Sequence, residues 1–203
     1  MQLIGMLDSP YVRRVAISLQ LLGLPFEHRS LSVFRTFEQF SRINPVVKAP
    51  TLVCDDGEVL MDSTLILDYA EALAAPRSLM PAALGERRHA LRLIGLALAA
   101  CEKTVQIVYE RTLRPPEKWH EPWMTRVHGQ LAQACALLEH EVPRAAPPLA
   151  TDTLDQAGVT VAVAWSFMQG VAAEQVTAAA HPALAAFAAR AEALPVFLAF
   201  PQE

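Results

Sequence analysis

The segment Asn44-Pro-Val-Val-Lys-Ala-Pro-Thr-Leu-Val-Cys-Asp-Asp-Gly-Glu-Val-Leu-Met-Asp-Ser63 is the most informative part of this sequence. Residues 51–54 and 59–61 are two short β-prone runs. Between them, Asp56-Gly57 is a strong signal for a tight turn, because glycine tolerates the positive φ that such turns require. The segment therefore predicts an antiparallel β-hairpin.

Two features flank this hairpin. Pro50 stands at the first position of a strand, where a cis peptide bond would expose the backbone of Ala49 to a ligand. Asp62 and Ser63 open an apolar run with helical spacing, and the free N–H groups of a helix N-terminus favour a bound carboxylate. The alternative interpretation is a trans proline followed by an ordinary aspartate N-cap. Local chemistry alone favours this alternative.

The residues before the hairpin predict the rest of a small sheet. Four segments have strand, helix, strand and helix patterns in that order: 2–6, 10–22, 26–32 and 36–43. Ser9-Pro10 and Gly23 are typical start and stop signals for the first of these helices. A strand–helix–strand crossover is parallel, whereas a hairpin is antiparallel. We therefore expect a mixed four-stranded sheet with flanking helices.

Helical patterns dominate the second half of the chain. Residues 76–81 contain two prolines and predict a linker between an α/β domain at 1–75 and an all-helical domain at 82–203. Helices are expected over the following segments: 85–113, 118–141, about 156–168, a short stretch after residue 170, and 182–193. Thr153 with Gln156 fits a capping box at the start of the nearly all-apolar third helix, and Asp152 with Asp155 is a competing register.

Composition excludes several classes of protein. With 53% hydrophobic and 19% charged residues over 203 positions, the chain can bury a substantial core. A net charge of −4 without a basic cluster argues against nucleic-acid binding. Cys54, Cys101 and Cys135 have no metal-ligand spacing, and no other residues predict a metal site. We expect a protein without a secretory signal or membrane span, located in the reducing cytoplasm.

Several motifs, in this order and spacing, resemble the cytosolic glutathione transferase family, in particular bacterial members with a serine-type active site. Residues 48–52 (Lys-Ala-Pro-Thr-Leu) are similar to the family segment that carries a cis-proline, and Asp62-Ser63 to its acidic-serine pair. Residues 9–15 (Ser-Pro-Tyr-Val-Arg-Arg-Val) are similar to the N-terminal motif of the serine-type classes. Residues 152–156, 181–184 and 194–196 match C-terminal landmarks. The resemblance covers the chain and implies a thioredoxin-like domain followed by an all-helical one.

The resemblance also implies roles in holding glutathione, with glutathione as co-substrate and no other cofactor. Lys48 would meet the glycine carboxylate. Ala49, before a cis Pro50, would offer its backbone to the cysteinyl residue as an added strand does. Asp62 would accept from the γ-glutamyl ammonium, and Ser63 with the helix N-terminus would bind the γ-glutamyl carboxylate.

Ser9 is the candidate catalytic residue. Its hydroxyl would donate a hydrogen bond to the glutathione sulfur, which favours the thiolate and lowers the pKa of the thiol. The alternative is that Ser9 only caps the first helix, and the two roles compete for one hydroxyl. Tyr11 is an alternative hydroxyl or a pocket residue, and Arg13 is either a cation near the sulfur or a surface residue. Because position 9 is not cysteine, the resemblance argues against the cysteine-type branches.

A pocket for a small hydrophobic electrophile is expected from the aromatic and basic residues near residues 109–123. These residues are Tyr109, Arg111, Trp119 and Trp123, and the alternatives are core aromatics and a solvated helix-end charge.

Three functional hypotheses follow. The first is a glutathione transferase of the detoxification type, which adds the thiolate to an electrophile. The second keeps the glutathione site for isomerisation, peroxide reduction or dehalogenation, and the third is a non-catalytic glutathione-binding or interaction module. A symmetric homodimer is also expected, with the helix after Asp62 and the long helix from Gly85 as candidate surfaces.

Overall fold

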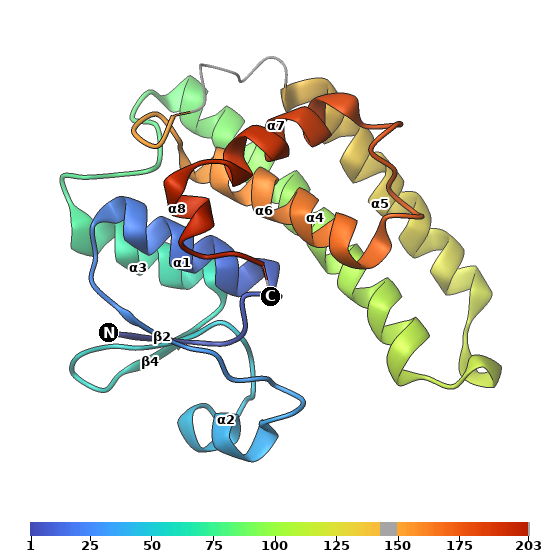
Figure 1. The fold of residues 1–203 in the computed structure, drawn as a ribbon, viewed down its shortest axis with the longest axis horizontal. Coiled ribbons are helices and arrows are strands. Elements are labelled where there is room, and N and C mark those ends of the chain that lie inside the picture. Colours follow the sequence, from blue (N-terminus) through green and yellow to red (C-terminus); the bar gives the residue numbers. More distant parts are fainter. Residues whose placement is uncertain (143–149, 203) are drawn as a thin grey trace. The chain divides into compact units, whose positions relative to one another are not determined.

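The structure is a computed structural model that describes residues 1–142 and 150–202. The chain forms two compact units (Figure 1). Unit 1 comprises Met1–Met80 together with Leu194–Glu203, and unit 2 comprises Pro81–Ala193.

Unit 1 contains the expected mixed four-stranded sheet. Its strands are β1 (Gln2–Ile4), β2 (Glu27–Arg29), β3 (Thr51–Val53) and β4 (Val59–Met61), in the order β2-β1-β3-β4. The β1–β2 pair is parallel, and the β1–β3 and β3–β4 pairs are antiparallel. The predicted thioredoxin-like sheet is therefore confirmed.

Helices cover both faces of this sheet. Helices α1 (Pro10–Leu22) and α3 (Ser63–Ala74) lie on one face, and α2 (Phe37–Ile43) lies on the other (Figure 1). Helix α1 buries nearly its whole length, which suits its position between the sheet and the elements packed on its outer side. It ends at Gly23, whose φ of 73° and backbone bond to the Gln20 carbonyl form the expected glycine stop.

The C-terminal segment returns to unit 1. Helix α8 (Pro195–Leu198) is followed by Phe200, whose ring stacks on Phe26 with centroids 5.7 Å apart. The Arg13 Nε atom donates to the Phe200 carbonyl at 2.8 Å, and the Arg13 guanidinium lies 5.5 Å from the centre of the Phe197 ring. These contacts explain why Leu194–Glu203 groups with the sheet, whereas the sequence placed 82–203 in one helical domain.

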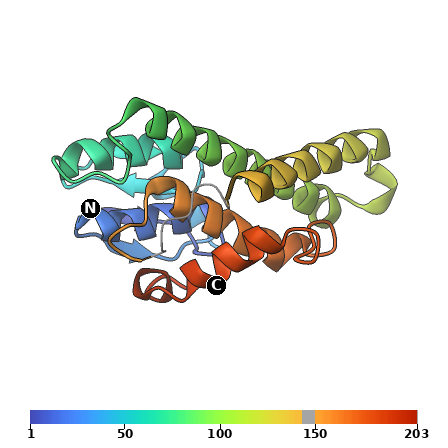
Figure 2. The same ribbon diagram turned by 90° about the horizontal axis from the view of Figure 1, so that it is seen from above.

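Unit 2 is helical, as the periodicity predicted. Its helices are α4 (Leu84–Leu113), the 3₁₀ helix η1 (Pro116–Lys118), α5 (Glu121–Glu141), α6 (Gln156–Ala172) and α7 (Pro182–Glu192). Helices α4 and α5 run side by side (Figure 2). Helix α6 is buried along most of its length and packs against α4 and α7, which makes it the centre of this unit.

Two local predictions in unit 2 are wrong. No separate helix follows Gly170, because α6 continues through this glycine to Ala172. The N-cap of α6 is Asp155, whose Oδ1 accepts from the Gly158 N–H at 2.7 Å, so the box expected at Thr153 is not formed. Among the described residues, no helix is both long and apolar enough to cross a membrane.

Candidate functional site

Strand register brings the candidate residues of unit 1 to one edge of the sheet. Ile4, the last residue of β1, pairs with the last residue of β2, Arg29, and with the first residue of β3, Thr51. Thr51 in turn pairs with Met61, the last residue of β4. The loop that carries Ser9, the segment 48–50 and the pair Asp62-Ser63 therefore leave the sheet at the same edge.

Gly5 allows two of these loops to touch. A Cβ atom at this position would lie 2.6 Å from Val12 Cγ2 and 3.2 Å from Ala49 Cβ, and the φ of Gly5 is +140°. Glycine is therefore required both for the conformation and for the close approach. The Gly5 carbonyl accepts from His28 Nε2 at 2.7 Å, which ties the loop leading to Ser9 to strand β2.

Ser9 is the N-cap of α1. Its Oγ accepts from the Val12 N–H at 3.4 Å, a long hydrogen bond, and Pro10 follows at N1. A hydroxyl has two acceptor lone pairs and one donor proton, so capping leaves the proton of Ser9 available. The capping role and the proposed donation to a thiolate are thus compatible, and they do not compete for the hydroxyl.

Lys48 and Asp62 lie beside each other. Lys48 Nζ is 3.6 Å from Asp62 Oδ2, and about half of each side chain is exposed. Asp62 Oδ1 accepts from the Thr64 N–H at 2.9 Å, which makes Asp62 the N-cap of α3. Asp62 has a φ of 73°, a conformation that only a few per cent of non-glycine residues adopt. The structure therefore brings together the two charged residues that the sequence singled out in this segment.

Pro50 and Ser63 are the remaining residues of the predicted binding site in this segment. The Ala49–Pro50 peptide bond is cis, as the resemblance implied. Ser63 is 4% exposed and is the first residue of α3, directly after the Asp62 cap.

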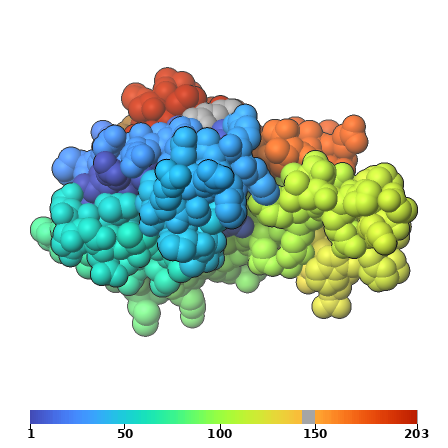
Figure 3. Space-filling view, turned by 90° about the horizontal axis from the view of Figure 1, so that it is seen from below, coloured from blue at the N-terminus to red at the C-terminus, as the bar shows by residue number. Residues whose placement is uncertain are grey.

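The arginines near this edge differ from expectation. Arg13 is 1% exposed and is engaged with Phe197 and Phe200, so it is a buried residue of unit 1 and not a surface one. Arg35 was not singled out by the sequence. It lies in the segment between β2 and α2, and its guanidinium reaches Met6 Sδ at 3.2 Å, on the loop that leads to Ser9. No motif marks Arg35, and only the fold brings it there. Figure 3 shows α2 and its flanking segments on the surface of unit 1.

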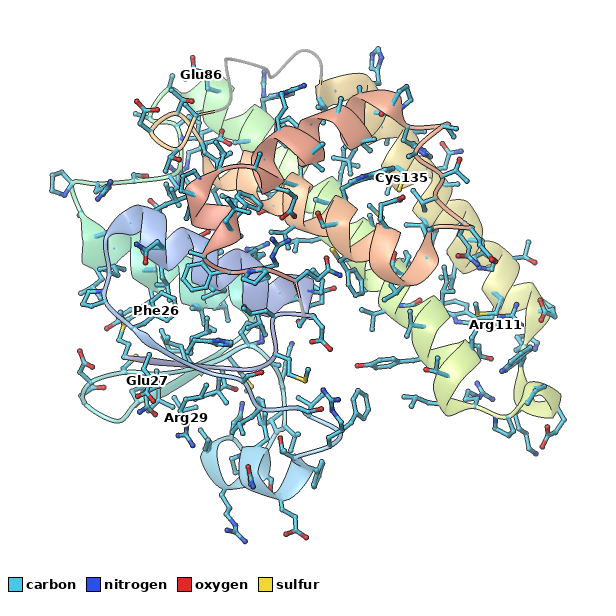
Figure 4. All side chains as sticks on the ribbon, viewed as in Figure 1. Phe26, Glu27, Arg29, Glu86, Arg111 and Cys135 are labelled. Carbon is cyan, nitrogen blue, oxygen red and sulfur yellow. The ribbon has the colours of Figure 1, made fainter. Side chains whose placement is uncertain are left out.

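Four candidate pocket residues belong to unit 2, near the junction of α4 and α5. The Arg111 guanidinium lies 4.2 Å from the centre of the Trp119 ring and pairs with Glu121 at 3.3 Å. Figure 4 labels Arg111 in this part of unit 2. Tyr109 and Trp123 are each 43% exposed, so neither is a buried core aromatic. Arg111 and Trp119 thus form a half-buried cation–π pair, and the Tyr109 and Trp123 side chains are partly exposed.

Glu110 organises this junction, although no sequence motif marks it. It is 8% exposed and accepts from Arg114 Nη1 and from the His120 N–H, each at 3.1 Å. A buried carboxylate needs such partners, and here they close the connection between α4 and α5.

The protein's own thiols are poor nucleophiles. Cys54, Cys101 and Cys135 are buried, and none of them is in a disulfide. Burial raises the pKa of Cys135 to about 12, and burial raises the pKa of Cys54 despite a hydrogen bond with Tyr69 that acts in the opposite direction. Within the described residues, no group of three or more His, Cys, Asp or Glu side chains has metal-site geometry.

Comparisons with known proteins agree with this geometry. The sequence profile of the glutathione S-transferase N-terminal domain matches residues 3–78. The chain is 26% identical to the uncharacterized GST-like protein YibF of Escherichia coli strain K12 over 168 residues, 83% of this chain and 82% of YibF. A glutathione transferase family member from Pseudomonas fluorescens Pf-5, solved with bound S-(propanoic acid)-glutathione, is 30% identical, with a TM-score of 0.80 and 98% of both chains covered. A glutathione S-transferase from Methylobacterium radiotolerans JCM 2831, solved with glutathione sulfonate, is 27% identical, with a TM-score of 0.85, 98% of this chain and 92% of that chain being covered.

Proposed function

The chain belongs to the glutathione S-transferase family, and we propose that it binds glutathione at the shared edge of unit 1 and activates the thiol for attack on a small hydrophobic electrophile. One observation carries the proposal. Strand register and the Gly5–Ala49 approach gather Ser9, Lys48-Ala49 and Asp62-Ser63 at one edge of the sheet.

The charges at this edge suit a tripeptide with a carboxylate at each end. Lys48 meets the glycine carboxylate, and Asp62 accepts from the γ-glutamyl ammonium. Ser63 and the N-terminus of α3 take the γ-glutamyl carboxylate, because free N–H groups and the helix dipole favour an anion there. The Lys48–Asp62 pair is half exposed, and such pairs contribute at most about 1 kcal/mol, so the ligand can replace it with two new ion pairs.

Ser9 supplies the activating hydrogen bond in this proposal. Its hydroxyl donates to the glutathione sulfur while a lone pair still caps α1. Hydrogen bonding to the charged form lowers the pKa of the thiol, and the α1 N-terminus adds positive potential. Ser9 then acts by electrostatics and forms no covalent bond.

The first experiment tests binding. We expect saturable binding of glutathione in calorimetry and retention on immobilised glutathione, with weaker affinity for Lys48→Ala and Ser63→Ala. Lys118→Ala, which changes an exposed lysine of unit 2, is the matched control and should bind as the wild type does. Failure of the wild-type protein to bind glutathione would rule out every enzyme hypothesis given above.

A second experiment separates catalysis from binding alone. Conjugation of glutathione to a chromogenic aryl halide is expected for an active transferase. Saturable glutathione binding without turnover of any electrophile would favour the non-catalytic binding module. Variants of Tyr109, Arg111, Trp119 and Trp123 are expected to change KM for the electrophile without changing the affinity for glutathione.

We also infer a homodimer that uses α3. Leu65, Tyr69 and Leu73 are 64%, 38% and 50% exposed, and their spacing along the helix places them on one stripe. An exposed apolar stripe of this kind on a monomer is typical of an interaction surface. A two-fold axis would pair this self-complementary surface with the same surface of a second copy.

A further inference from the structure

A chain of buried hydrogen bonds supports the loop that carries Lys48 and Ala49. Asn44 ends α2 and Thr51 begins β3, and they are 4% and 0% exposed. Asn44 Nδ2 donates to Thr51 Oγ1 at 2.8 Å, and Thr51 Oγ1 donates to the Lys48 carbonyl at 2.8 Å. Neither residue was a site candidate from the sequence, since Asn44 only follows the helix predicted over 36–43 and Thr51 only begins the β-prone run 51–54.

The direction of each hydrogen bond between Asn44, Thr51 and Lys48 is determined by the donor and acceptor groups available. The Lys48 carbonyl only accepts, so the single Thr51 proton points to it and Thr51 must accept from Asn44. The Asn44 amide group therefore faces Thr51 with its nitrogen, and its Oδ1 accepts from the Val46 N–H at 3.0 Å. A longer contact of 3.6 Å joins Asn44 Nδ2 to Met61 Sδ. Both side chains are satisfied, and reversal of either would break a bond.

The backbone of the same loop is held in an unfavourable conformation. The Val47 N–H donates to the Asn44 carbonyl at 2.9 Å, which closes a turn, and Val47 has a φ of 52°. A β-branched residue rarely adopts positive φ, so the surrounding contacts must hold it there. The bonds of Asn44 and Thr51 supply such contacts at both ends of the turn.

We propose that Asn44 and Thr51 are positioning residues for glutathione, a role that rests on the proposed function. They fix the carbonyl of Lys48, and through it the backbone of Ala49, while Asp62 has a further bond of its own to the Thr64 N–H at the start of α3. Loss of these hydrogen bonds is therefore expected to weaken binding of the cysteinyl-glycine end of glutathione. The γ-glutamyl end keeps its own anchors.

The experiment compares pairs of variants that differ only in the hydroxyl at position 51. Thr51→Val is nearly isosteric with the wild type, and Thr51→Ser and Thr51→Ala form a second pair in case Thr51→Val does not fold. Dissociation constants are measured by calorimetry for two probes, glutathione and γ-glutamylcysteine, which lacks the glycine carboxylate. Thermal unfolding is recorded for each variant.

Without the hydroxyl, the dissociation constant of glutathione should rise about tenfold. The rise in the dissociation constant should be smaller for γ-glutamylcysteine, so Thr51→Val and Thr51→Ala should prefer glutathione over γ-glutamylcysteine less strongly than the wild type does. Thr51→Ser keeps the hydroxyl and should restore the wild-type preference. A lower unfolding temperature with an unchanged ratio of the two constants would mean a purely structural role and would overturn the proposal. Absence of glutathione binding by the wild type would instead refute the proposed function, and the inference with it.

Discussion

At the scale of single residues, the geometry of the Ser9 hydroxyl allows both roles that its position suggested as alternatives, helix cap and thiol activator. The cap uses a lone pair, because Oγ accepts from the Val12 N–H, and thiol activation would use the proton. The 3.4 Å length of the capping bond also leaves the hydroxyl weakly held. The roles can therefore be separated by experiment.

Ser9→Ala is expected to lower the conjugation rate about tenfold to a hundredfold, because a hydrogen bond to a charged group contributes about 1.5–3 kcal/mol. The pH–rate profile should also move to higher pH, since the pKa of the bound thiol rises when the hydrogen bond from Ser9 is lost. Ser9→Thr keeps the hydroxyl and the cap and is the control. If Ser9→Ala binds glutathione and keeps the wild-type rate, Ser9 is a cap and nothing more.

Val47 gives a second prediction at this scale. Glycine adopts positive φ without penalty, so Val47→Gly should stabilise the fold or leave it unchanged, despite the extra flexibility of the unfolded chain. Val46→Gly, at a neighbouring valine outside the positive-φ residues, should instead destabilise by roughly 0.5–1 kcal/mol. Urea unfolding of both variants provides the comparison. Equal destabilisation by the two changes would contradict the strained conformation of Val47.

At the scale of elements, helix N-termini do much of the positioning in this protein. Ser9, Asp62 and Asp155 cap α1, α3 and α6 with side-chain oxygens. The caps of α1 and α3 lie at the candidate site, whereas the half-buried cap of α6 belongs to unit 2. Burial raises the pKa of the Asp155 carboxyl above its ordinary value of 3.8.

The pH dependence of the α6 cap follows from that direction. A raised native pKa means that the Asp155 carboxyl holds its proton more tightly in the folded than in the unfolded protein. Protonation of Asp155 therefore stabilises the fold at acid pH, and this contribution is lost as pH rises through the native pKa. Asp155→Asn keeps a good cap without a buried charge, and near neutral pH it should be at least as stable as the wild type. That advantage should vanish below the ordinary pKa of 3.8.

Asp155→Ala removes the cap at every pH and should cost about 1 kcal/mol. Thermal or urea unfolding of the three proteins at several pH values tests both statements. An asparagine variant that is clearly less stable than the wild type at neutral pH would show that the charge of Asp155 contributes to the cap.

At the scale of the whole molecule, the chain does not divide at a single point. The segment Leu194–Glu203 returns to unit 1 after the helices of unit 2 have been completed. Arg13 is the anchor, because a buried guanidinium needs the Phe200 carbonyl and the Phe197 ring as partners. The last residues of the sequence therefore complete the core built by the first.

The homodimer is the prediction that belongs to this scale. Leu65→Glu combined with Leu73→Glu places like charges on the α3 stripe, which should convert a dimer into a monomer near 22.2 kDa in sedimentation. Leu198→Glu changes another exposed leucine of unit 1, 66% exposed, and should leave the dimer intact. A wild-type protein that sediments as a monomer would remove the proposal.

Sequence patterns predicted most of the fold because they are local. The Asp56-Gly57 turn, the Ser9-Pro10 start and the helical periodicity each depend on neighbours within a few residues. Helix ends were less well predicted. Gly170 did not stop α6, because an isolated glycine is tolerated inside a helix that is stabilised by burial along most of its length.

The sequence by itself determined the order of elements in unit 1, the mixed sheet, the capped starts of α1 and α3, and the residue types available for glutathione. Only the tertiary structure decided how they meet: the strand register, the approach of Gly5 to Ala49, the pairing of Lys48 with Asp62 and the return of Phe200 to Arg13. The same holds for the Asn44–Thr51 support, which no motif announces. The physical reason is that these contacts join residues far apart or depend on burial, and neither is written in the spacing of a local pattern.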